Sequence, residues 1–451
     1  MKFTGIFIGL MTLTVAAGAQ KNDSLPKLTY NEAVKIALER NVNLNQQKNL
    51  LFSREVSKNA AIANLGPNLF INGGGSRNIG QQQNPENGDL ENLTVDQFGA
   101  NLTAQITVFN GFNRINQLQS SIQQFKAQTA FVSRTEQDVI YNVTTQFLQV
   151  LLDQELLRIA EENYNAQKAL LDQIKESVRL GARAEADLYN QDAQVMNMHV
   201  TALRAKVTLE NDKALLAQTL QLDPSIPVHV ASPNPANAIN LSTDLPLDSL
   251  YAIALHSRAD LKQAIYQAEA SKFTYRASAS GYYPNVTFGA SYGSAFFSSL
   301  KPNPIYGDFN NQFLDVLRST NYQVNFTIPL FSRLANRNLR VSNKVTYENA
   351  LLQKENLEKT IKIDVQRAYK NYLAAIESYQ AGLAQLQSGE LALKTQEESF
   401  ILGVASQVTL AQANQTYVQA AASKAQAEVT LVFQSILLDY ALGTLKIDNI
   451  K

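Results

Sequence analysis

Three histidines are the side chains in this sequence best suited to acid–base catalysis or metal binding, and they are far apart. His199, His229 and His256 have no second histidine nearby and belong to no local motif. A catalytic base or a metal ligand needs partners at a defined spacing, as in HExxH. The sequence contains neither HExxH nor the phosphate-binding motif GxxxxGK[ST]. We therefore interpret each histidine as structural, and we predict a protein that is not an enzyme and has no cofactor.

Adjacent carboxylates and a run of glycines are the other candidates for chemistry. The pairs Glu161-Glu162 and Glu397-Glu398 lie in expected helices, where neighbouring residues point in different directions, so we expect them to be solvated. The glycines at 73–75 lie inside an expected strand with no helix after it, which argues against a phosphate loop. Only four Met and three His are present, which argues against a metal relay.

The composition excludes several further classes of protein. The 451 residues include no Cys, which excludes disulfides, a thiol nucleophile, a thiolate metal site and an N-terminal lipid anchor on cysteine. Lys plus Arg and Asp plus Glu both number 39, and the resulting zero net charge argues against a nucleic-acid partner.

The first 19 residues have the pattern of a secretory signal peptide. Lys2 supplies the positive charge, residues 3–15 are apolar, and Ala-Gly-Ala at 17–19 forms a small-residue cleavage site. No other segment approaches the ~20 apolar residues that a transmembrane helix needs. We therefore expect an exported protein in which any membrane span consists of β-strands.

The chain reads as two copies of one unit of about 220 residues. The segment from Leu28 matches the segment from Leu245, and the same offset carries Pro67 onto Pro284 without a gap. Five such matches in the same order are unlikely to arise by chance. Further along the chain, the matched sites are TVFNGFNR (107–114) with PLFSRLANR (329–337), Leu180-Gly181 with Leu402-Gly403, and Leu220 with Leu442.

Each copy has the same order of expected elements. A helical segment ends before Pro67 or Pro284, because a proline stops a helix and favours an extended chain. Two strands follow, then a helix of roughly 100 Å, a break at Leu-Gly and a returning helix. The expected first helices are 29–64 and 247–280, the strands 67–76, 95–110, 284–297 and 319–331, and the long helices 112–179 and 334–401. The expected division is a signal peptide (1–19), a first repeat (20–222), an inter-repeat segment (223–246), a second repeat (247–445) and a C-terminal tail (446–451).

The expected strands alternate between apolar and polar residues, so each has two chemically different faces. Strands of about ten residues with this alternation, joined by long polar loops such as 76–94 and 298–317, are typical of outer-membrane barrels. Half-buried hairpins on a soluble domain show the same alternation, so this pattern alone leaves both readings open. The positions expected to face lipid are Phe98, Leu102, Ile106, Phe288, Tyr322, Val324, Phe326 and Ile328.

The expected long helices carry apolar residues at steps of three and four, as in coiled coils. Glu136 interrupts this pattern in the first copy, and we expect Gly382 and Gly389 to loosen or bend the helix of the second. A helix this long cannot bury an apolar stripe against itself. It must pack on its returning partner and on neighbouring chains.

Four strands per chain cannot close a barrel in a membrane. Unpaired backbone groups in lipid cost several kcal/mol each, and membrane barrels start at about eight strands. Several chains must therefore contribute strands to one barrel. We favour three chains and twelve strands, because the small polar residues of the other face would leave room for a lumen.

With these features, the chain resembles the TolC-like outer membrane efflux proteins over essentially the whole mature sequence. The resemblance rests on the duplication, on Pro67 and Pro284 at strand entry, and on the segments VRLGARAEADLYNQDAQV (178–195) and FILGVASQVTLAQANQTY (400–417). It implies a mainly α fold with a β-barrel portion, in which a trimeric twelve-stranded outer-membrane barrel stands on an α-helical periplasmic tunnel. It also implies an equatorial region built from the inter-repeat segment and the tail.

The resemblance also implies partners and a docking region. A homotrimer surrounded by outer-membrane lipid would receive a periplasmic adaptor (membrane fusion) protein, and the adaptor would link it to an inner-membrane pump. The adaptor would dock at the two helix–turn–helix tips, where glycine permits a positive φ at the reversal. The tip residues are Leu180, Gly181, Leu402 and Gly403.

The periplasmic entrance departs from the family pattern in the second copy. Asp187 matches an aspartate of the family pattern at the tip of the first copy. In the second copy, Thr409 and Gln412 stand where better-known members of the family carry two carboxylates. This difference argues against a ring of aspartates at the closed entrance. A basic residue that often links the tips is replaced by Ala405, and Arg183 in the other tip is the candidate to compensate.

We therefore expect the exit duct of a tripartite efflux or type I secretion system, which passively conducts substrates from the periplasm and inner-membrane pump to the exterior. The alternative is an exported trimeric coiled-coil spacer or adhesin-like stalk without conduit activity. A spacer accounts for the helices and the export signal. It does not explain why both copies carry a hairpin with an apolar face at the same place.

Overall fold

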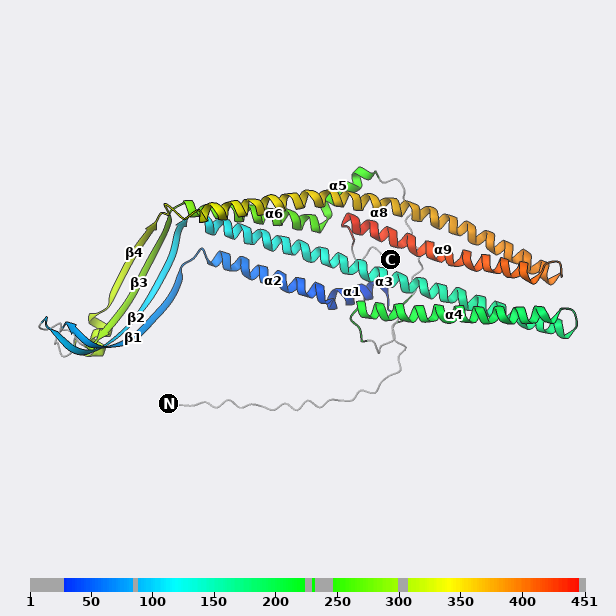
Figure 1. The fold of residues 1–451 in the computed structure, drawn as a ribbon, viewed down its shortest axis with the longest axis horizontal. Helices are drawn as coiled ribbons and strands as arrows, with labels where there is room; N and C mark the ends of the chain where they lie inside the picture. Colours follow the sequence, from blue (N-terminus) through cyan, green and yellow to red (C-terminus); the bar gives the residue numbers. More distant parts are fainter. Residues whose placement is uncertain (1–27, 84–87, 224–228, 232–245, 299–306, 446–451) are drawn as a thin grey trace, which may run out of the picture.

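The computed structural model describes residues 28–83, 88–223, 229–231, 246–298 and 307–445. The expected signal peptide, most of the inter-repeat segment and the C-terminal tail lie outside the described residues. The molecule is elongated, with long helices lying lengthwise and a β-sheet extending from one end (Figure 1). The fold is mainly helical with one four-stranded sheet, as predicted.

The helical segment before each β-hairpin is divided in two. In the first copy, α1 (Tyr30–Arg40) and α2 (Val42–Ala63) meet at Asn41, whose Oδ1 accepts a hydrogen bond from the Leu44 N–H at 2.9 Å. In the second copy, α5 (Leu247–Ser257) and α6 (Ala259–Ala277) meet at Arg258, the equivalent position. The expected helical segments over 29–64 and 247–280 are therefore confirmed, but each consists of two successive helices. An extended residue interrupts the helical hydrogen bonds, and in the first copy its side chain caps the next helix.

Four strands form one antiparallel sheet in the order β1-β2-β3-β4. They are β1 (Asn68–Gln83), β2 (Leu90–Asn110), β3 (Asn285–Phe297) and β4 (Ser319–Thr327). The two copies are joined through the pairing of β2 with β3. The first hairpin extends through much of the expected loop 76–94. The sequence does not predict this outer part of the hairpin, because its residues do not alternate between apolar and polar. Nearly all of β1 is exposed, so no buried face requires an apolar side chain at every second position.

The last strand is shorter than expected. We predicted a strand over 319–331, but β4 ends at Thr327. Ile328 lies outside the strand, so its assignment as a strand position is wrong. The physical reason is Pro329, which has no N–H to donate to a β-ladder.

The two long helices form as predicted. The helices α3 (Asn113–Arg179) and α8 (Ala335–Ile401) each contain 67 residues, and they return as α4 (Glu185–Thr219) and α9 (Gln407–Leu442). Gly382 and Gly389 do not interrupt α8. A Cβ at either glycine would lie 3.4 Å from the Cα of Lys424 or Tyr417 on α9, so these residues permit close helix packing.

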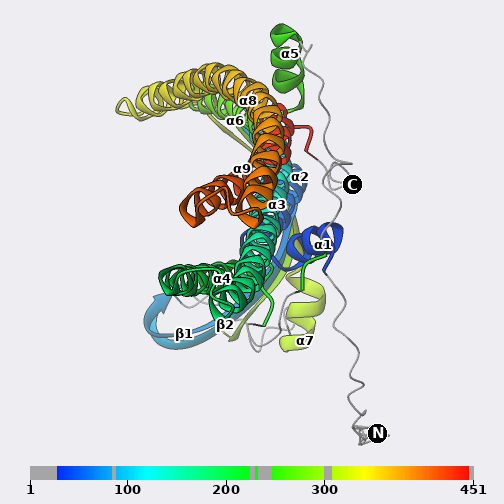
Figure 2. The same cartoon turned by 90° about the vertical axis from the view of Figure 1, so that its right-hand side faces the viewer.

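Equivalent residues of the two copies build two separate cores. Ala37 of α1 and Ala254 of α5 are both fully buried. Each is the middle residue of an Ile-Ala-Leu triplet, and the two triplets occupy equivalent positions in the two copies. Ala37 belongs to a cluster with Phe147 of α3, whereas Ala254 belongs to one with Ile361 of α8. The helical hairpins α3–α4 and α8–α9 lie side by side along a curved line (Figure 2). No helix among the described residues has the length and hydropathy to cross a membrane.

Candidate functional site: the two-faced sheet and the helical tips

One face of the sheet is apolar across all four strands. Directly opposed residues of paired strands lie on the same face, so the register shows which side chains are neighbours. Leu102 is opposite Ile71 on one side and Tyr292 on the other, and Phe288 is opposite both Ile106 and Val324. The predicted positions on β2, β3 and β4 therefore lie on one common face. Its members are Leu69, Ile71, Phe98, Leu102, Ile106, Val286, Phe288, Tyr292, Phe296, Tyr322, Val324 and Phe326.

The opposite face is formed mainly by small and polar side chains. Phe70, opposite Thr103, is an exception that the sequence pattern did not indicate. The edges of β1 and β4 have no partner within the described part of the chain. The sheet therefore presents one oily face, one polar face and two open edges. The polar-face residues are Asn72, Gly74, Asn101, Thr103, Gln105, Gly289, Ser291, Gly293, Asn321, Gln323 and Asn325.

The segment 289–293, GASYG, matches the GxSxG signature of serine hydrolases. In those enzymes the serine lies at a sharp turn between a strand and a helix. Ser291 instead lies within β3, opposite Thr103 and Asn321. This serine is therefore part of the polar face and has no nucleophile geometry.

The two helical tips have the same turn geometry. At the first tip, Gly181 has a φ of 71°, and its N–H and that of Ala182 donate to the carbonyls of Val178 and Ser177 at 2.9 and 2.8 Å. The second tip repeats this pattern of hydrogen bonds around Gly403, with a φ of 75°. This is a Schellman motif, which favours glycine at the left-handed position. The preceding leucines project into solvent: Leu180 is 67% exposed and Leu402 is 78% exposed.

Arg183 connects the two tips. Its Nη2 donates to the backbone oxygen of Phe400 on α8 at 3.1 Å, and its guanidinium lies 3.8 Å from the centroid of the Phe400 ring. Its Nη1 lies 4.0 Å from Oδ2 of Asp187. Arg183 of the first hairpin is thus held by the second, although Ala405 offers no basic side chain there.

The positions predicted at the entrance have different surroundings. Asp187 is partly exposed, and its backbone oxygen accepts a hydrogen bond from Nε2 of Gln407 at 3.2 Å. Thr409 belongs to the cap of α9, since its Oγ1 donates to the Ser406 backbone oxygen at 2.7 Å. Gln412 is exposed on the next turn. The structure therefore brings Asp187, Arg183 and Gln407 together, but it does not bring Thr409 or Gln412 into this group of contacts.

A set of amide side chains, not singled out in the sequence, joins the hairpins above the tips. Gln407 of α9 donates to Oε1 of Gln191 on α4 at 3.1 Å, and Gln191 donates to Oε1 of Gln167 on α3 at 2.9 Å. Farther along, Nδ2 of Asn414 donates to Oδ1 of Asn163 at 2.9 Å. Gln191 is only 2% exposed. The sequence signal for these contacts is a polar residue at a core position of a coiled coil, because such residues specify the register between the paired helices.

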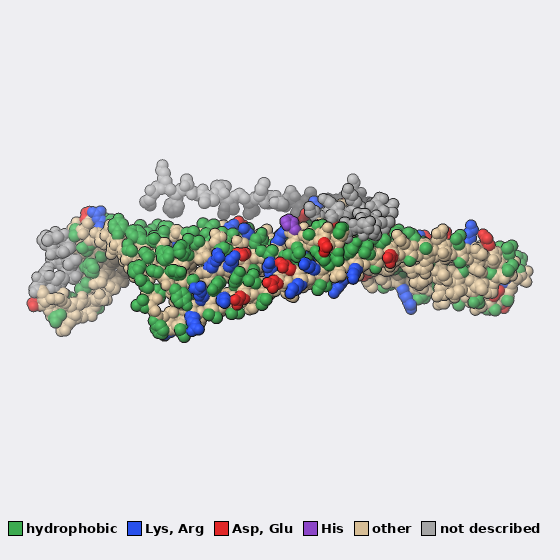
Figure 3. Space-filling model, turned by 90° about the horizontal axis from the view of Figure 1, so that it is seen from above, with side chains coloured by type: hydrophobic (Ala, Val, Ile, Leu, Met, Phe, Trp, Pro, Cys, Tyr) green, Lys and Arg blue, Asp and Glu red, His purple; other side chains and the backbone are tan. Residues whose placement is uncertain are grey.

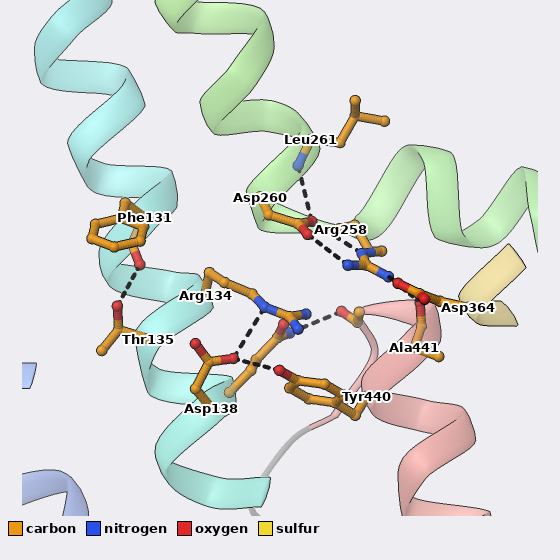
Figure 4. Close-up of polar contacts among 12 residues, drawn as sticks. Phe131, Arg134, Thr135, Asp138, Arg258, Asp260, Leu261, Asp364, Tyr440 and Ala441 are labelled. Atoms are coloured by element: carbon orange, nitrogen blue, oxygen red, sulfur yellow. Dashed lines mark hydrogen bonds and ion pairs between the residues drawn. The ribbon is translucent and has the colours of Figure 1, made fainter. Parts of the chain in front are cut away.

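A buried arginine joins the second repeat's helices at the break between α5 and α6 (Figure 4). Arg258 is 5% exposed, and its Nη2 lies 2.6 Å from Oδ2 of Asp260. Its Nη1 lies 3.3 Å from Oδ2 of Asp364 and 3.5 Å from the Ala441 backbone oxygen. Burial alone would raise the pKa of Asp260, but the hydrogen bonds and charge of Arg258 outweigh it and hold that pKa below its usual range. This residue anchors α5, α6, α8 and α9 to one another.

Asp153 of α3 is a buried carboxylate without a cationic partner among its described contacts. It is 4% exposed, Oδ1 accepts from Nε2 of Gln149 at 3.2 Å, and Oδ2 has no donor. Asp212 of α4 lies within hydrogen-bonding reach. Burial first, and then the neighbouring Asp212, raise the pKa of Asp153 to about 7. Within three residues of Asp153 and Asp212 in the sequence, Glu155 pairs with Arg158 on α3, and Glu210 pairs with Lys213 on α4.

We expect Asp153→Asn to stabilise the protein by about 1–2 kcal/mol at pH 8 and to have little effect at pH 4. The folded-state pKa is raised, so the folded chain binds the extra proton and wild-type stability falls as the pH rises from about 4 through 7. An amide stays neutral and can donate to Asp212. Thermal unfolding of the purified protein at both pH values measures this difference. The exposed Asp192→Asn on α4 is the control, and an equal effect of Asp153→Asn at both pH values would contradict the assignment.

The part of the chain that the structure describes contains no group of three or more His, Cys, Asp or Glu that could hold a metal ion. His199 instead packs against Tyr164, with the ring centroids 5.0 Å apart. The chemical features of the described chain are thus a two-faced sheet with open edges and a pair of exposed tips linked through Arg183.

Comparison with known proteins agrees with this geometry. The family profile of the outer membrane efflux protein matches residues 33–220 and 250–444. The outer membrane protein TolC of Salmonella enteritidis is 24% identical over 316 residues, and that of Escherichia coli is 23% identical over 314. Each match covers 69% of this chain and 62% of the relative, so the chain matches less than two thirds of the length of either.

Solved structures share the fold over nearly the whole chain. The CmeC outer membrane channel of Campylobacter jejuni superposes with a TM-score of 0.79 at 17% identity, covering 92% of this chain and 85% of that one. The open state of the MtrE outer membrane channel of Neisseria gonorrhoeae has a TM-score of 0.77 at 17% identity, covering 94% and 91%. With the duplicated fold, the sheet and the profile match to both repeats, the chain belongs to the outer membrane efflux protein family.

Proposed function

We propose that three copies of this outer-membrane protein close one twelve-stranded barrel and form a passive exit duct. The observation that carries the proposal is the sheet: it has an apolar face, a polar face and two unpaired edges. Open edges in lipid are costly, so β4 of one copy would pair with β1 of the next. The apolar face would then contact lipid, and the polar face would line the lumen.

The helices support the same assembly. The first half of α8 exposes several apolar side chains, and Figure 3 shows apolar side chains gathered where the helices approach the sheet. Contact between neighbouring copies would bury them. The residues concerned are Leu339, Val341, Val345 and Leu352.

We further propose that the tips form the periplasmic entrance and receive a periplasmic adaptor linked to an inner-membrane pump. The exposed Leu180 and Leu402 on rigid turns supply an apolar contact for such a partner. The duct would conduct substrates of an efflux or secretion system without chemistry of its own. The alternative, a coiled-coil spacer, leaves the two-faced sheet without a role.

Conductance and fractionation distinguish a duct from a spacer. Purified protein reconstituted into planar bilayers is expected to give discrete conductance steps, and the native protein is expected to remain in outer membranes after carbonate extraction. A spacer would give no steps and would be released by carbonate.

Arg183→Ala is expected to increase the conductance and the frequency of open events in planar bilayers. The change removes the hydrogen bond and the cation–π contact to Phe400, together about 1–2 kcal/mol, and so frees the two hairpins at the entrance. Arg179→Ala is the matched control, because Arg179 pairs only with Glu176 of its own helix among its described contacts. Equal conductance of wild type and Arg183→Ala would show that this contact does not restrain the entrance.

A further inference from the structure

Residues 307–318, which precede β4, fold back onto the sheet at the end farthest from the long helices (Figure 1). They contain a helical turn α7 (Phe309–Asn311) followed by η4 (Gln312–Val316). Gln312 is fully buried: its Oε1 accepts from the Phe297 N–H at 3.0 Å, and its Nε2 donates to the Gly307 oxygen at 3.3 Å. Pairing of β3 with β4 ends at Gly293, so Gln312 supplies a partner to a β3 edge that β4 leaves free.

Two aromatic side chains fix this segment on the apolar face. Phe309 lies 5.1 Å from Phe296 and 6.0 Å from Phe98, measured between ring centroids. Phe313 lies 5.4 Å from Phe98 and is stacked on Phe309 at 5.3 Å. Phe98 and Phe296 are directly opposed on the apolar face. The segment therefore lies on the side proposed to face lipid, not on the side proposed to line the lumen.

Part of the outer surface of this segment is also apolar. Leu314 is 59% exposed, while Val316 and Phe309 are each 40% exposed. Residues 307–318 carry three charged side chains. Nη2 of Arg318 lies 3.2 Å from Oδ1 of Asp315, and Oδ1 of Asp308 accepts a hydrogen bond from the Asn311 N–H at 3.0 Å. Exposed apolar side chains on a segment already seated on the apolar face extend that face outward.

The height of the segment corresponds to a membrane boundary. The apolar face of β2 runs from Phe98 to Phe109, which lies opposite Val286 after a bulge. The eleven residue-to-residue steps from Phe98 to Phe109 span about 37 Å, or about 28 Å along the membrane normal at a tilt of ~40°. The apolar band of a membrane barrel is about 25 Å tall and ends in aromatic girdles. Phe98 and the aromatics packed on it therefore lie at the end of this band.

We propose that residues 308–318 form an interfacial anchor that inserts Leu314, Val316 and Phe309 among the acyl chains of the outer leaflet. This inference rests on the proposed barrel. The partner is a lipid surface, because the segment continues the lipid-facing side of the sheet. Two of its three charged side chains, Asp315 and Arg318, pair with each other, and Asp308 caps α7. The anchor fixes the depth of the barrel in the membrane and covers the free edge of β3.

Tryptophan fluorescence tests this placement without background, because the chain contains no Trp. Leu314→Trp, reconstituted in vesicles of brominated phosphatidylcholine, is expected to lose about half of its fluorescence relative to unbrominated vesicles, most with bromine near the headgroup. Val316→Trp is a second variant that is expected to give the same result. Leu102→Trp at mid-strand is expected to be quenched most by deeply placed bromine, and Leu402→Trp at the tip is expected to be unaffected.

The controls separate this inference from the proposed function. If Leu102→Trp is quenched but Leu314→Trp and Val316→Trp are not, the barrel stands and the anchor is wrong. A blue-shifted but unquenched Leu314→Trp would place the segment against a neighbouring copy, which also overturns the anchor. If Leu102→Trp itself escapes quenching, the lipid-facing assignment of the sheet fails.

Discussion

Leu102→Arg is expected to destabilise the membrane-inserted protein by about 2–4 kcal/mol and to leave little assembled barrel in the outer membrane. Leu102 lies at mid-strand in β2, with Ile71 and Tyr292 opposite it on the same apolar face. A guanidinium at this position would have to lie in hydrocarbon, where water cannot solvate it. Phe326→Arg on β4, at a side chain that is 62% exposed in the single chain, is expected to have a similar effect.

Neighbouring residues on the other face provide the matched controls. Asn101→Arg and Asn325→Arg place the same charge one residue away but on the polar face. Because this face is proposed to line a water-filled lumen, these variants are expected to assemble like the wild type. The measurement is the amount of heat-stable oligomer in outer-membrane fractions on unheated gels. Equal loss for both faces would count against the barrel.

Arg258→Ala is expected to have the largest effect on the helical part of the molecule, a loss of about 3–5 kcal/mol. Removing the guanidinium leaves the carboxylate of Asp260 without its cation in a largely buried site. It also removes the contacts with Asp364 and the Ala441 oxygen, which join α8 and α9 to the break between α5 and α6. Thermal unfolding of the detergent-purified protein by circular dichroism measures the loss.

Two further variants check the cause of this loss. The double variant Arg258→Ala with Asp260→Ala is expected to be more stable than Arg258→Ala alone, because the more deeply buried carboxylate is removed. The carboxylate of Asp364, which also loses its partner, is 39% exposed and water can solvate it. Arg158→Ala, which removes an exposed arginine paired with Glu155 and Glu162, is expected to cost less than about 1 kcal/mol. An equally small loss for Arg258→Ala would show that the buried cluster does not hold these helices together.

The ion pair also predicts a pH dependence. The pKa of Asp260 is lowered in the folded state, so the pair stabilises the protein fully above the unfolded value of about 4. This contribution is lost as the pH falls through the lower folded-state pKa. Wild type is therefore expected to lose more stability than the double variant when the pH is lowered from 6 to 3. Parallel curves for the two proteins would contradict this assignment.

Patterns within short segments of the sequence predict many of the helices and strands of this fold. The alternation from Phe98 to Ile106 predicts a strand with two faces, and the cross-strand register confirms that these residues share one face. The absence of proline from 113 to 179 predicts a single helix, which the structure confirms over all 67 residues. Such features follow from the sequence because each depends on neighbouring side chains and on the period of one element.

The sequence pattern failed where a single residue or an exposed surface decided the outcome. Asn41 and Arg258 divide the two helical segments because each leaves the helical backbone conformation. The Asn41 side chain caps the next helix, whereas Arg258 makes no cap and pairs with Asp260. The outer part of β1 has no buried face, so no period of two marks it.

By itself, then, the sequence determined the duplication, the order of elements, the two faces of the strands and the family. Only the tertiary structure decided which distant residues meet. Arg183 contacts Phe400 across 217 positions, Asp153 approaches Asp212, and Phe309 and Phe313 seat on Phe98. The physical reason is that these contacts depend on how whole helices and strands pack. A small rotation or shift of one element exchanges the partners while the local sequence pattern stays the same.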